Sequence, residues 1–91
     1  MARKSLIHTR KTRTWTGKEL HLEYYLTDEA ILGGCADSYG VEVRAKSERG
    51  EEYAGVGGIT MQGTRILELL DLLAAGTVTP TGLYDAVQDW L

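Results

Sequence analysis

The chain has 91 residues, of which 43% are hydrophobic and 25% are charged, and its formal net charge is −3. This length and composition predict one folded domain spanning residues 1–91 and exclude a disordered low-complexity chain. The small net charge argues against a dedicated nucleic-acid binder, and without an apolar run of about 20 residues we expect no contact with a membrane.

The charges are divided unevenly along the chain. The first 18 residues contain six basic residues and no acid, whereas the rest contain four basic residues and all thirteen acids. A chain polarised in this way is expected to present a basic edge on an acidic body. The division limits the partners of the protein without identifying them.

The first predicted element is a β-hairpin. Residues 19–26 alternate polar with apolar side chains, which is typical of a strand with one buried face. Residues 6–15 form the preceding strand, and Thr16-Gly17-Lys18 supplies the turn. Neither face of this first strand suits a core, and its Lys and Arg residues are typical of an outermost strand that resists unwanted pairing. Residues 1–5 are expected to be disordered.

A second hairpin follows, with strands over residues 39–46 and 51–59 around the turn at residues 47–50. Glycines at positions 55, 57 and 58 weaken the last strand and indicate a bulge or the close approach of another backbone. Residues 28–38 are expected to form a longer connection between the hairpins, with residues 30–32 forming one helical turn or packing at the end of the core.

The period changes after Thr60. Residues 66, 69, 70 and 73 form an apolar stripe with helical spacing, and Leu67 and Leu72 widen it beyond half of the circumference. Thr60 or Thr64 is expected to cap the start of this helix, and Gly76 to adopt the left-handed conformation at its end. Pro80 then begins a second helix, capped by Thr79, with Leu83, Val87, Trp90 and Leu91 on one face.

These elements predict an α+β fold of the order β-β-β-β-α-α. Two antiparallel hairpins form a four-stranded sheet, and a C-terminal helical hairpin packs on it. Because the apolar face of the first helix is wide, we expect it to be covered on two sides, with Trp90 of the second helix on one flank. The same wide face could instead dock on a second copy, so that monomer and homodimer both remain open.

The segment from Leu69 to Pro80 resembles the C-terminal signature of a family of small uncharacterised proteins, of unknown function, from clostridia-like Firmicutes. In that family a leucine-rich helix ends at a Gly-Thr-Val-Thr-Pro turn, here residues 76–80, and a short acidic helix follows. Tyr24-Tyr25-Leu26 and residues 39–43 are similar to two strands of the family. The resemblance covers most of the chain from about Leu20, supports the fold and implies no activity.

Candidate catalytic and cofactor-binding groups are few. His8 and His21 are expected to face each other across the first hairpin with Glu19 and Glu23 nearby, which is a ligand set that zinc accepts. Solvated strand pairs explain these residues more simply, and a lone Cys35 is more often an apolar filler than a nucleophile. The run Gly55-Val56-Gly57-Gly58 lacks the Gly-Lys-Ser/Thr ending of a phosphate loop. We therefore predict no enzyme, no metal and no cofactor.

The basic strand is the strongest functional candidate in the sequence. We predict that the chain is a protein-binding or regulatory domain that acts in the cytoplasm, since a single cysteine allows no internal disulfide. The expected contact residues are Arg10, Lys11, Arg13, Trp15 and Lys18. The alternative is a nucleic-acid-binding module in which these cations follow phosphates while the indole stacks on a base. Small size and the resemblance alone suggest a phage or mobile-element inhibitor of a host defence enzyme.

Overall fold

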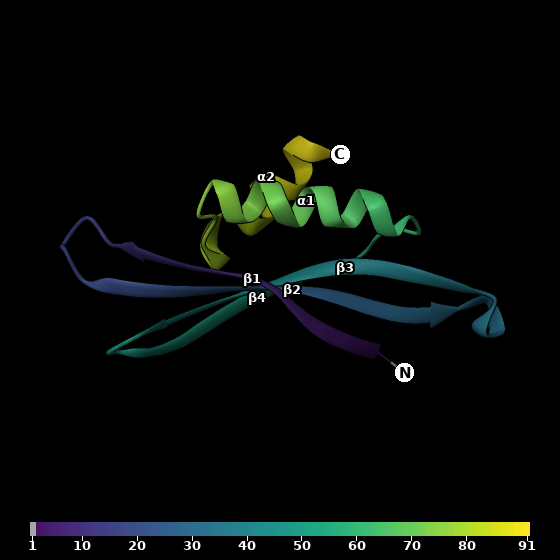
Figure 1. Cartoon of the computed structure of the whole chain (residues 1–91), viewed down its shortest axis with the longest axis horizontal. Helices are drawn as coiled ribbons and strands as arrows, with labels where there is room; N and C mark the ends of the chain where they lie inside the picture. The colour runs from purple at the N-terminus through teal and green to yellow at the C-terminus, as the bar shows by residue number, and fades with distance from the viewer. Residues whose placement is uncertain (1) are drawn as a thin grey trace.

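The computed structural model describes residues 2–91, which form one elongated body of about 47 × 25 × 17 Å (Figure 1). Four antiparallel strands in the order β1-β2-β3-β4 make a single sheet, and two helices follow. The predicted α+β fold and its element order are therefore confirmed. The elements are β1 (Ala2–Arg13), β2 (Glu19–Ile31), β3 (Ala36–Ser47), β4 (Gly50–Thr60), α1 (Gly63–Ala75) and α2 (Leu83–Trp90).

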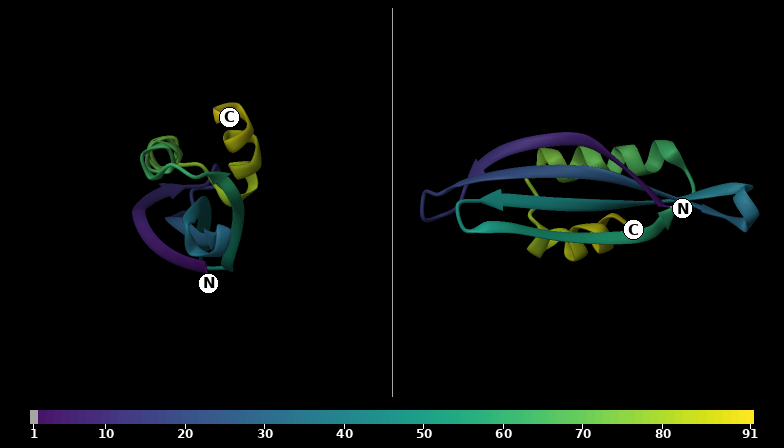
Figure 2. Two further views of the ribbon diagram at one scale, coloured as in Figure 1. Left: turned by 90° about the vertical axis from the view of Figure 1, so that its right-hand side faces the viewer. Right: turned by 90° about the horizontal axis from the view of Figure 1, so that it is seen from below.

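Both helices lie on the same side of the twisted sheet (Figure 2). We call this side the helix face and the other side the open face. The β1–β2 and β3–β4 turns lie together at one end of the molecule, and the β2–β3 turn lies at the opposite end (Figure 1). No helix in residues 2–91 is both long enough and apolar enough to cross a bilayer.

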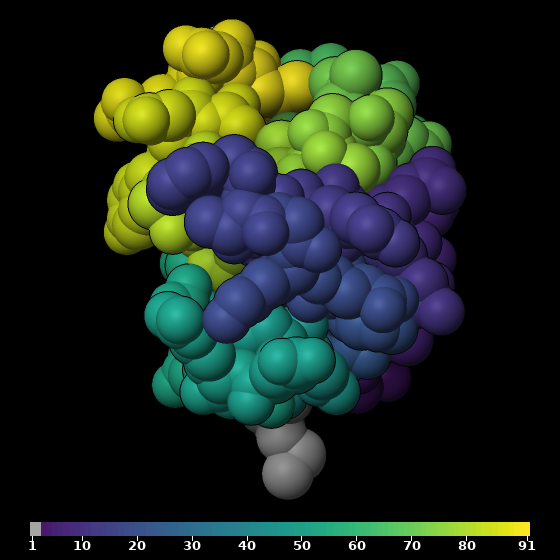
Figure 3. Space-filling view, turned by 90° about the vertical axis from the view of Figure 1, so that its left-hand side faces the viewer, coloured from purple at the N-terminus to yellow at the C-terminus, as the bar shows by residue number. Residues whose placement is uncertain are grey.

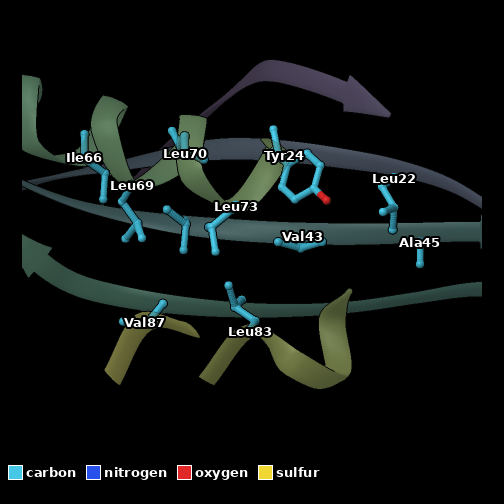
Figure 4. Close-up of a cluster of buried hydrophobic side chains, with 12 residues drawn as sticks. Leu22, Tyr24, Val43, Ala45, Ile66, Leu69, Leu70, Leu73, Leu83 and Val87 are labelled. Carbon is cyan, nitrogen blue, oxygen red and sulfur yellow. The ribbon is translucent and has the colours of Figure 1, made fainter. Parts of the chain in front are cut away.

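The core is a layer of apolar side chains between the sheet and the two helices, and α2 contributes Leu83 and Val87 to it (Figure 4). Alternation in β2 and β3 places Leu22, Tyr24 and Val43 on the helix face, where they are fully buried. Burial of a leucine-sized side chain contributes about 1.5–3 kcal/mol, so the α1 stripe is a major source of stability. The buried stripe consists of Ile66, Leu69, Leu70, Leu73 and Ala74.

The predicted double coverage of α1 is present, with the sheet on one side and α2 on one flank. Trp90 of α2 covers that flank, with the Arg65 guanidinium 4.4 Å from the centre of its ring. Leu67 and Leu72 remain 44% and 59% exposed, because the sheet and α2 together contact only part of the helix circumference. The α1 stripe that is buried is thus narrower than the apolar stripe in the sequence.

The connection predicted over residues 28–38 is wrong. β2 continues to Ile31 and β3 begins at Ala36, with residues 27–31 paired to residues 36–40. A short 3₁₀ turn at Leu32–Gly34 is enough to reverse the chain, because Leu32, Gly33 and Gly34 all have positive φ values. Residues 30–31, expected in a helical turn or at the end of the core, are extended.

β1 also differs from its predicted bounds. It starts at Ala2, so residues 2–5 pair with β2, and it ends at Arg13, so that Thr14 and Trp15 belong to the turn. A register shift between Leu6 and His8 marks a bulge at Ile7, which packs against the core. This bulge shifts the alternation of β1 side chains between the two faces of the sheet by one residue. It thereby decides which side chains after Ile7 point toward the helices.

The predicted caps of α1 are wrong at both ends. Gln62 occupies the N-cap position without a side-chain hydrogen bond, and Gly76 has an ordinary φ of −87°. The left-handed residue is Thr77, with a φ of +47°. The Thr77 and Val78 amides donate to the carbonyls of Ala74 and Leu73, which completes a Schellman motif one residue later than expected.

Pro80 begins a 3₁₀ turn (Pro80–Gly82) as its first residue, and α2 itself starts at Leu83. The buried Tyr24 hydroxyl donates to the Val78 carbonyl at 2.9 Å, which holds the α1–α2 connection on the sheet. Burial raises the pKa of Tyr24 to about 12, although the nearby Arg10 charge opposes this shift. The connection is thus fixed from the core.

The glycine-rich end of β4 forms the predicted bulge, at a close approach of two backbones. The pairs Val41–Val56 and Tyr39–Thr60 leave three β4 residues opposite Gly40. A Cβ atom at Gly40 would lie 2.3 Å from the Val56 carbonyl oxygen and 2.8 Å from the Gly57 Cα. Gly40 is therefore required by β4 packing.

Gly40→Ala should destabilise the protein by about 3 kcal/mol, because two backbone segments would have to move apart. Gly57→Ala is the matched control, since a Cβ there meets nothing within 4 Å, and it should change stability by no more than about 0.5 kcal/mol. Urea unfolding of the two variants measures the difference. Equal effects would contradict the close approach.

Candidate binding surface

The five predicted contact residues do not form one surface. Lys11 and Arg13 pair with His21 and Glu19, and their side chains lie on the open face of β1. Arg10 lies on the helix face, opposite Leu22. Strand alternation causes this separation, as expected for neighbouring positions of one strand. Trp15 and Lys18 lie in the β1–β2 turn.

Arg10 links β1 to α1. Its Nε donates to the Ala74 carbonyl at 3.2 Å, where a cation stabilises the exposed carbonyls of the last helical turn. One turn earlier, His8 Nε2 lies 2.6 Å from Asp71 Oδ1. Arg10 and His8 thus fasten the outermost strand to the helix, and Arg10 is a structural residue more than a contact residue.

The β1–β2 turn is held by several hydrogen bonds. The Thr14 amide donates to the Lys18 carbonyl and the Gly17 amide to the Thr14 carbonyl, both at 2.8 Å. Gly17 has a φ of +84°, which is typical of a three-residue loop closed by a bulge. The Thr14 hydroxyl lies 2.8 Å from that of Thr16 and accepts from the Lys18 amide. This framework presents Trp15 with 97% of its surface exposed.

A cleft of about 620 Å³ lies between the β1–β2 turn and the β3–β4 turn. We call it the tip cleft. Leu20 and Ala45 form its apolar floor, Trp15 and Lys18 belong to one wall, and Arg49 belongs to the other. Figure 3 looks onto this end of the molecule, where the dark blue β1–β2 turn lies beside the teal β3–β4 turn.

Arg49 and the cleft floor were not among the predicted site residues. The sequence did contain a signal, because consecutive antiparallel strands place alternate turns at the same end of a sheet. The two predicted turns, at residues 16–18 and 47–50, therefore had to lie near each other. No pattern in the sequence indicated how deep the cleft between the two turns would be.

Most other basic side chains are paired. Lys4 lies 3.2 Å and Arg44 2.8 Å from Glu42, and further ion pairs are Arg3–Asp28, Lys46–Glu23 and Arg65–Glu68. Within residues 2–91, the cations with neither an ion pair nor a side-chain hydrogen bond are Lys11, Arg13, Lys18 and Arg49. All four lie on the β1–β2 hairpin or in the β3–β4 turn. The available positive charge is therefore concentrated toward one end of the molecule.

The open face is stabilised by charges around an aromatic ring in place of an apolar core. The Lys4 ammonium and the Arg44 guanidinium lie 5.0 and 5.5 Å from the centre of the Tyr25 ring. Glu42 binds both cations, and the Tyr25 hydroxyl donates to Glu23 at 3.0 Å. This cluster, which we call the Tyr25 network, explains why Lys4 and Arg44 are unavailable to a partner.

The Tyr25 network changes the pKa values of its members. Burial alone would raise the pKa of Glu23 and of Glu42, but hydrogen bonds and charges from their partners lower both. The partners are Tyr25 and Lys46 for Glu23, and Arg44 and Lys4 for Glu42. Burial and the hydrogen bond to Glu23 raise the pKa of Tyr25. Both carboxylates are thus stabilised in the ionised form.

The structure separates the groups considered for metal binding and catalysis. His8 lies opposite Tyr24, and His21 lies opposite Lys11, so the two imidazoles do not face each other as expected. Residues 2–91 contain no group of three or more His, Cys, Asp or Glu residues arranged to hold a metal ion. Cys35 is exposed beside the β2–β3 turn, at the end of the molecule far from the tip cleft.

Arg10→Gln should lower the free energy of unfolding by about 1 kcal/mol, because the Ala74 carbonyl loses its charged donor. Lys11→Gln and Arg13→Gln, which remove the same charge from the open face, should each stay within about 0.5 kcal/mol of wild type. Chemical unfolding at neutral pH tests this. An equal loss in all three variants would show that charge alone, and not the contact with α1, is responsible.

The lowered pKa values of Glu23 and Glu42 predict acid lability. A carboxyl whose folded pKa is depressed adds stability above its ordinary value near 4.5, and this stability is lost as pH falls through the folded pKa. The urea midpoint should therefore fall between about pH 5 and pH 3. The fall should be smaller in the double variant Glu23→Gln/Glu42→Gln and unchanged in Glu48→Gln, whose side chain is exposed.

Comparison with known proteins places the chain in a family. A search of curated proteins and a search of solved structures each found no match. A model of the family DUF6514, described as a family of unknown function, matches residues 3–91. The matched range includes β2, β3, β4 and both helices, and all of β1 except Ala2. The chain therefore belongs to the family of unknown function DUF6514.

Proposed function

We propose that this chain is a non-enzymatic protein-binding domain and that it contacts an acidic partner through β1 and the β1–β2 turn. The supporting observation is the position of the unpaired cations. Lys11, Arg13 and Lys18 lie on a hairpin whose first strand is outermost in the sheet and pairs only with β2 among the described residues. An exposed strand edge can add an extended segment of a partner by main-chain hydrogen bonds.

Charge then selects the partner. A second copy of β1 would bring like charges together, because this strand contains five Lys and Arg residues and no acid. An acidic strand would instead place its carboxylates beside Lys11 and Arg13 on the open face. The exposed Trp15 at the end of the strand adds an aromatic side chain of the kind that contributes strongly to protein interfaces.

A nucleic-acid-binding module remains the second proposal, supported by the same cations with Trp15 as a stacking platform. Two features favour the first proposal. Arg10 is hydrogen-bonded to α1 and cannot follow a phosphate backbone without losing that contact. Glu48, Glu51 and Glu52 also line the tip cleft, where they would repel phosphates that follow Lys18 and Arg49, whereas the carboxylates of an acidic strand would face Lys11 and Arg13 on the open face.

We further propose that the domain is a cytoplasmic regulator, for example a phage or mobile-element inhibitor of a host defence enzyme. The support is its small size, the single cysteine and the resemblance of residues 69–80 to small proteins of clostridia-like Firmicutes. This part of the proposal does not depend on any residue of the binding surface. Monomeric and homodimeric forms are both compatible with it.

A tagged chain captured from lysate of its source organism should retain a stoichiometric protein partner, with and without nuclease treatment. The partner should be lost with Lys11→Gln/Arg13→Gln, because these substitutions remove the cations from the open face of β1. Gln62→Glu/Gln88→Glu is the matched control, since both double variants change the formal net charge from −3 to −5. The control should keep the partner.

Capture that disappears after nuclease treatment would contradict the first proposal and support the second. In that case purified chain should bind single-stranded nucleic acid with an affinity that falls steeply with salt, and each lost phosphate contact should reduce the log–log slope by about 0.7. Recovery of neither a protein nor a nucleic acid would contradict both.

A further inference from the structure

The tip cleft is a hollow that neither the core nor the Tyr25 network fills. Its volume of about 620 Å³ lies within the range of about 300–1,000 Å³ that is typical of binding sites. Leu20 and Ala45 form its floor where the helix face extends past the helices. A floor of this kind favours an apolar side chain over a charged one.

The walls of the cleft differ in charge. The β1–β2 turn contributes Lys18, and β1 brings Lys11 and Arg13 to the same hairpin. The β3–β4 hairpin contributes Arg49 together with Glu48, Glu51 and Glu52. A carboxylate would therefore be attracted along β1 and repelled near the far wall of the cleft.

We propose that the tip cleft binds one apolar anchor side chain of the acidic segment that adds to β1. This inference rests on the proposed protein-binding function and deepens it. Antiparallel addition is the more stable arrangement, so the partner strand runs from the tip toward the start of β1. Its anchor residue then precedes its acidic residues in the sequence, and the acidic residues recur at every second position.

Trp15 is the residue that makes this site a strong anchor point. Its indole is 97% exposed in the free protein and is held by a turn with two main-chain hydrogen bonds of 2.8 Å. A partner side chain seated on Leu20 and Ala45 would cover one side of the indole. Because the turn is already held in place, binding would cost little conformational entropy there, which favours affinity.

Two peptides test the inference by titration of isotope-labelled protein, followed by backbone amide and indole NMR signals. The first begins with leucine and continues with glutamate and valine in alternation, and the second has alanine in place of leucine. The leucine peptide should bind about tenfold more tightly, as a large apolar group does in a matching pocket. Only the leucine peptide should shift the signals of Leu20, Ala45 and the Trp15 indole.

Trp15→Ala should remove the advantage of the leucine peptide. Tyr84→Ala is the matched control, because Tyr84 is an aromatic residue of α2 that is 65% exposed and lies outside the cleft, and it should keep the advantage. A leucine peptide with the reversed sequence should bind more weakly than the forward one. Equal binding of the two directions would contradict the antiparallel arrangement.

Each other outcome contradicts a specific part of the proposal. Equal affinity of the two peptides, with shifts confined to β1, would overturn the anchor site and leave the strand-addition function standing. Shifts in the cleft without shifts in β1 would overturn strand addition. No shifts with either peptide would overturn both, as would shifts only with a short single-stranded oligonucleotide. Concentration-dependent shifts without peptide would identify a second copy of the chain as the occupant.

Discussion

The packing of the α1 stripe against β2 and β3 is the interaction on which the rest of the structure depends. Ile66, Leu69, Leu70 and Leu73 cover the helix face, and the two α-helices within residues 2–91 both lie on that face. The open face therefore receives no apolar cover. It is stabilised instead by the Tyr25 network, in which polar and charged side chains form ion pairs and cation–π contacts.

This one-sided core determines the use of the basic residues. Cations that lie near α1 or near Tyr25 have structural partners, as Arg10 does at the Ala74 carbonyl and Lys4 does at Glu42. Arg3 is paired with Asp28, and the four cations without such partners within residues 2–91, which are Lys11, Arg13, Lys18 and Arg49, lie at or near the end of the molecule where the two hairpin turns meet. Most of the basic residues are thus used within the fold. The surface available to a partner contains the few cations that remain unpaired.

The sequence was most informative where one period extended over many residues. Alternation in residues 19–26 and the stripe at residues 66–73 predicted the strands, the helix and the face that each buries. It was least informative at turns and caps. The extended β2–β3 arm depends on pairing between residues 27–31 and 36–40, which have no regular pattern, and the left-handed cap falls on Thr77 although Gly76 is the better residue for it.

The sequence alone determined the α+β class, the element order and the outermost position of a basic strand, because hydrophobic period and turn residues act locally. Only the tertiary structure decided which cations remain unpaired. A bulge at Ile7 sets the parity of β1 and turns Arg10 toward α1, while Lys11 and Arg13 face outward. The tip cleft likewise exists only because two turns far apart in the sequence are brought together by the register of four strands. Such contacts depend on long-range pairing, and no local pattern encodes them.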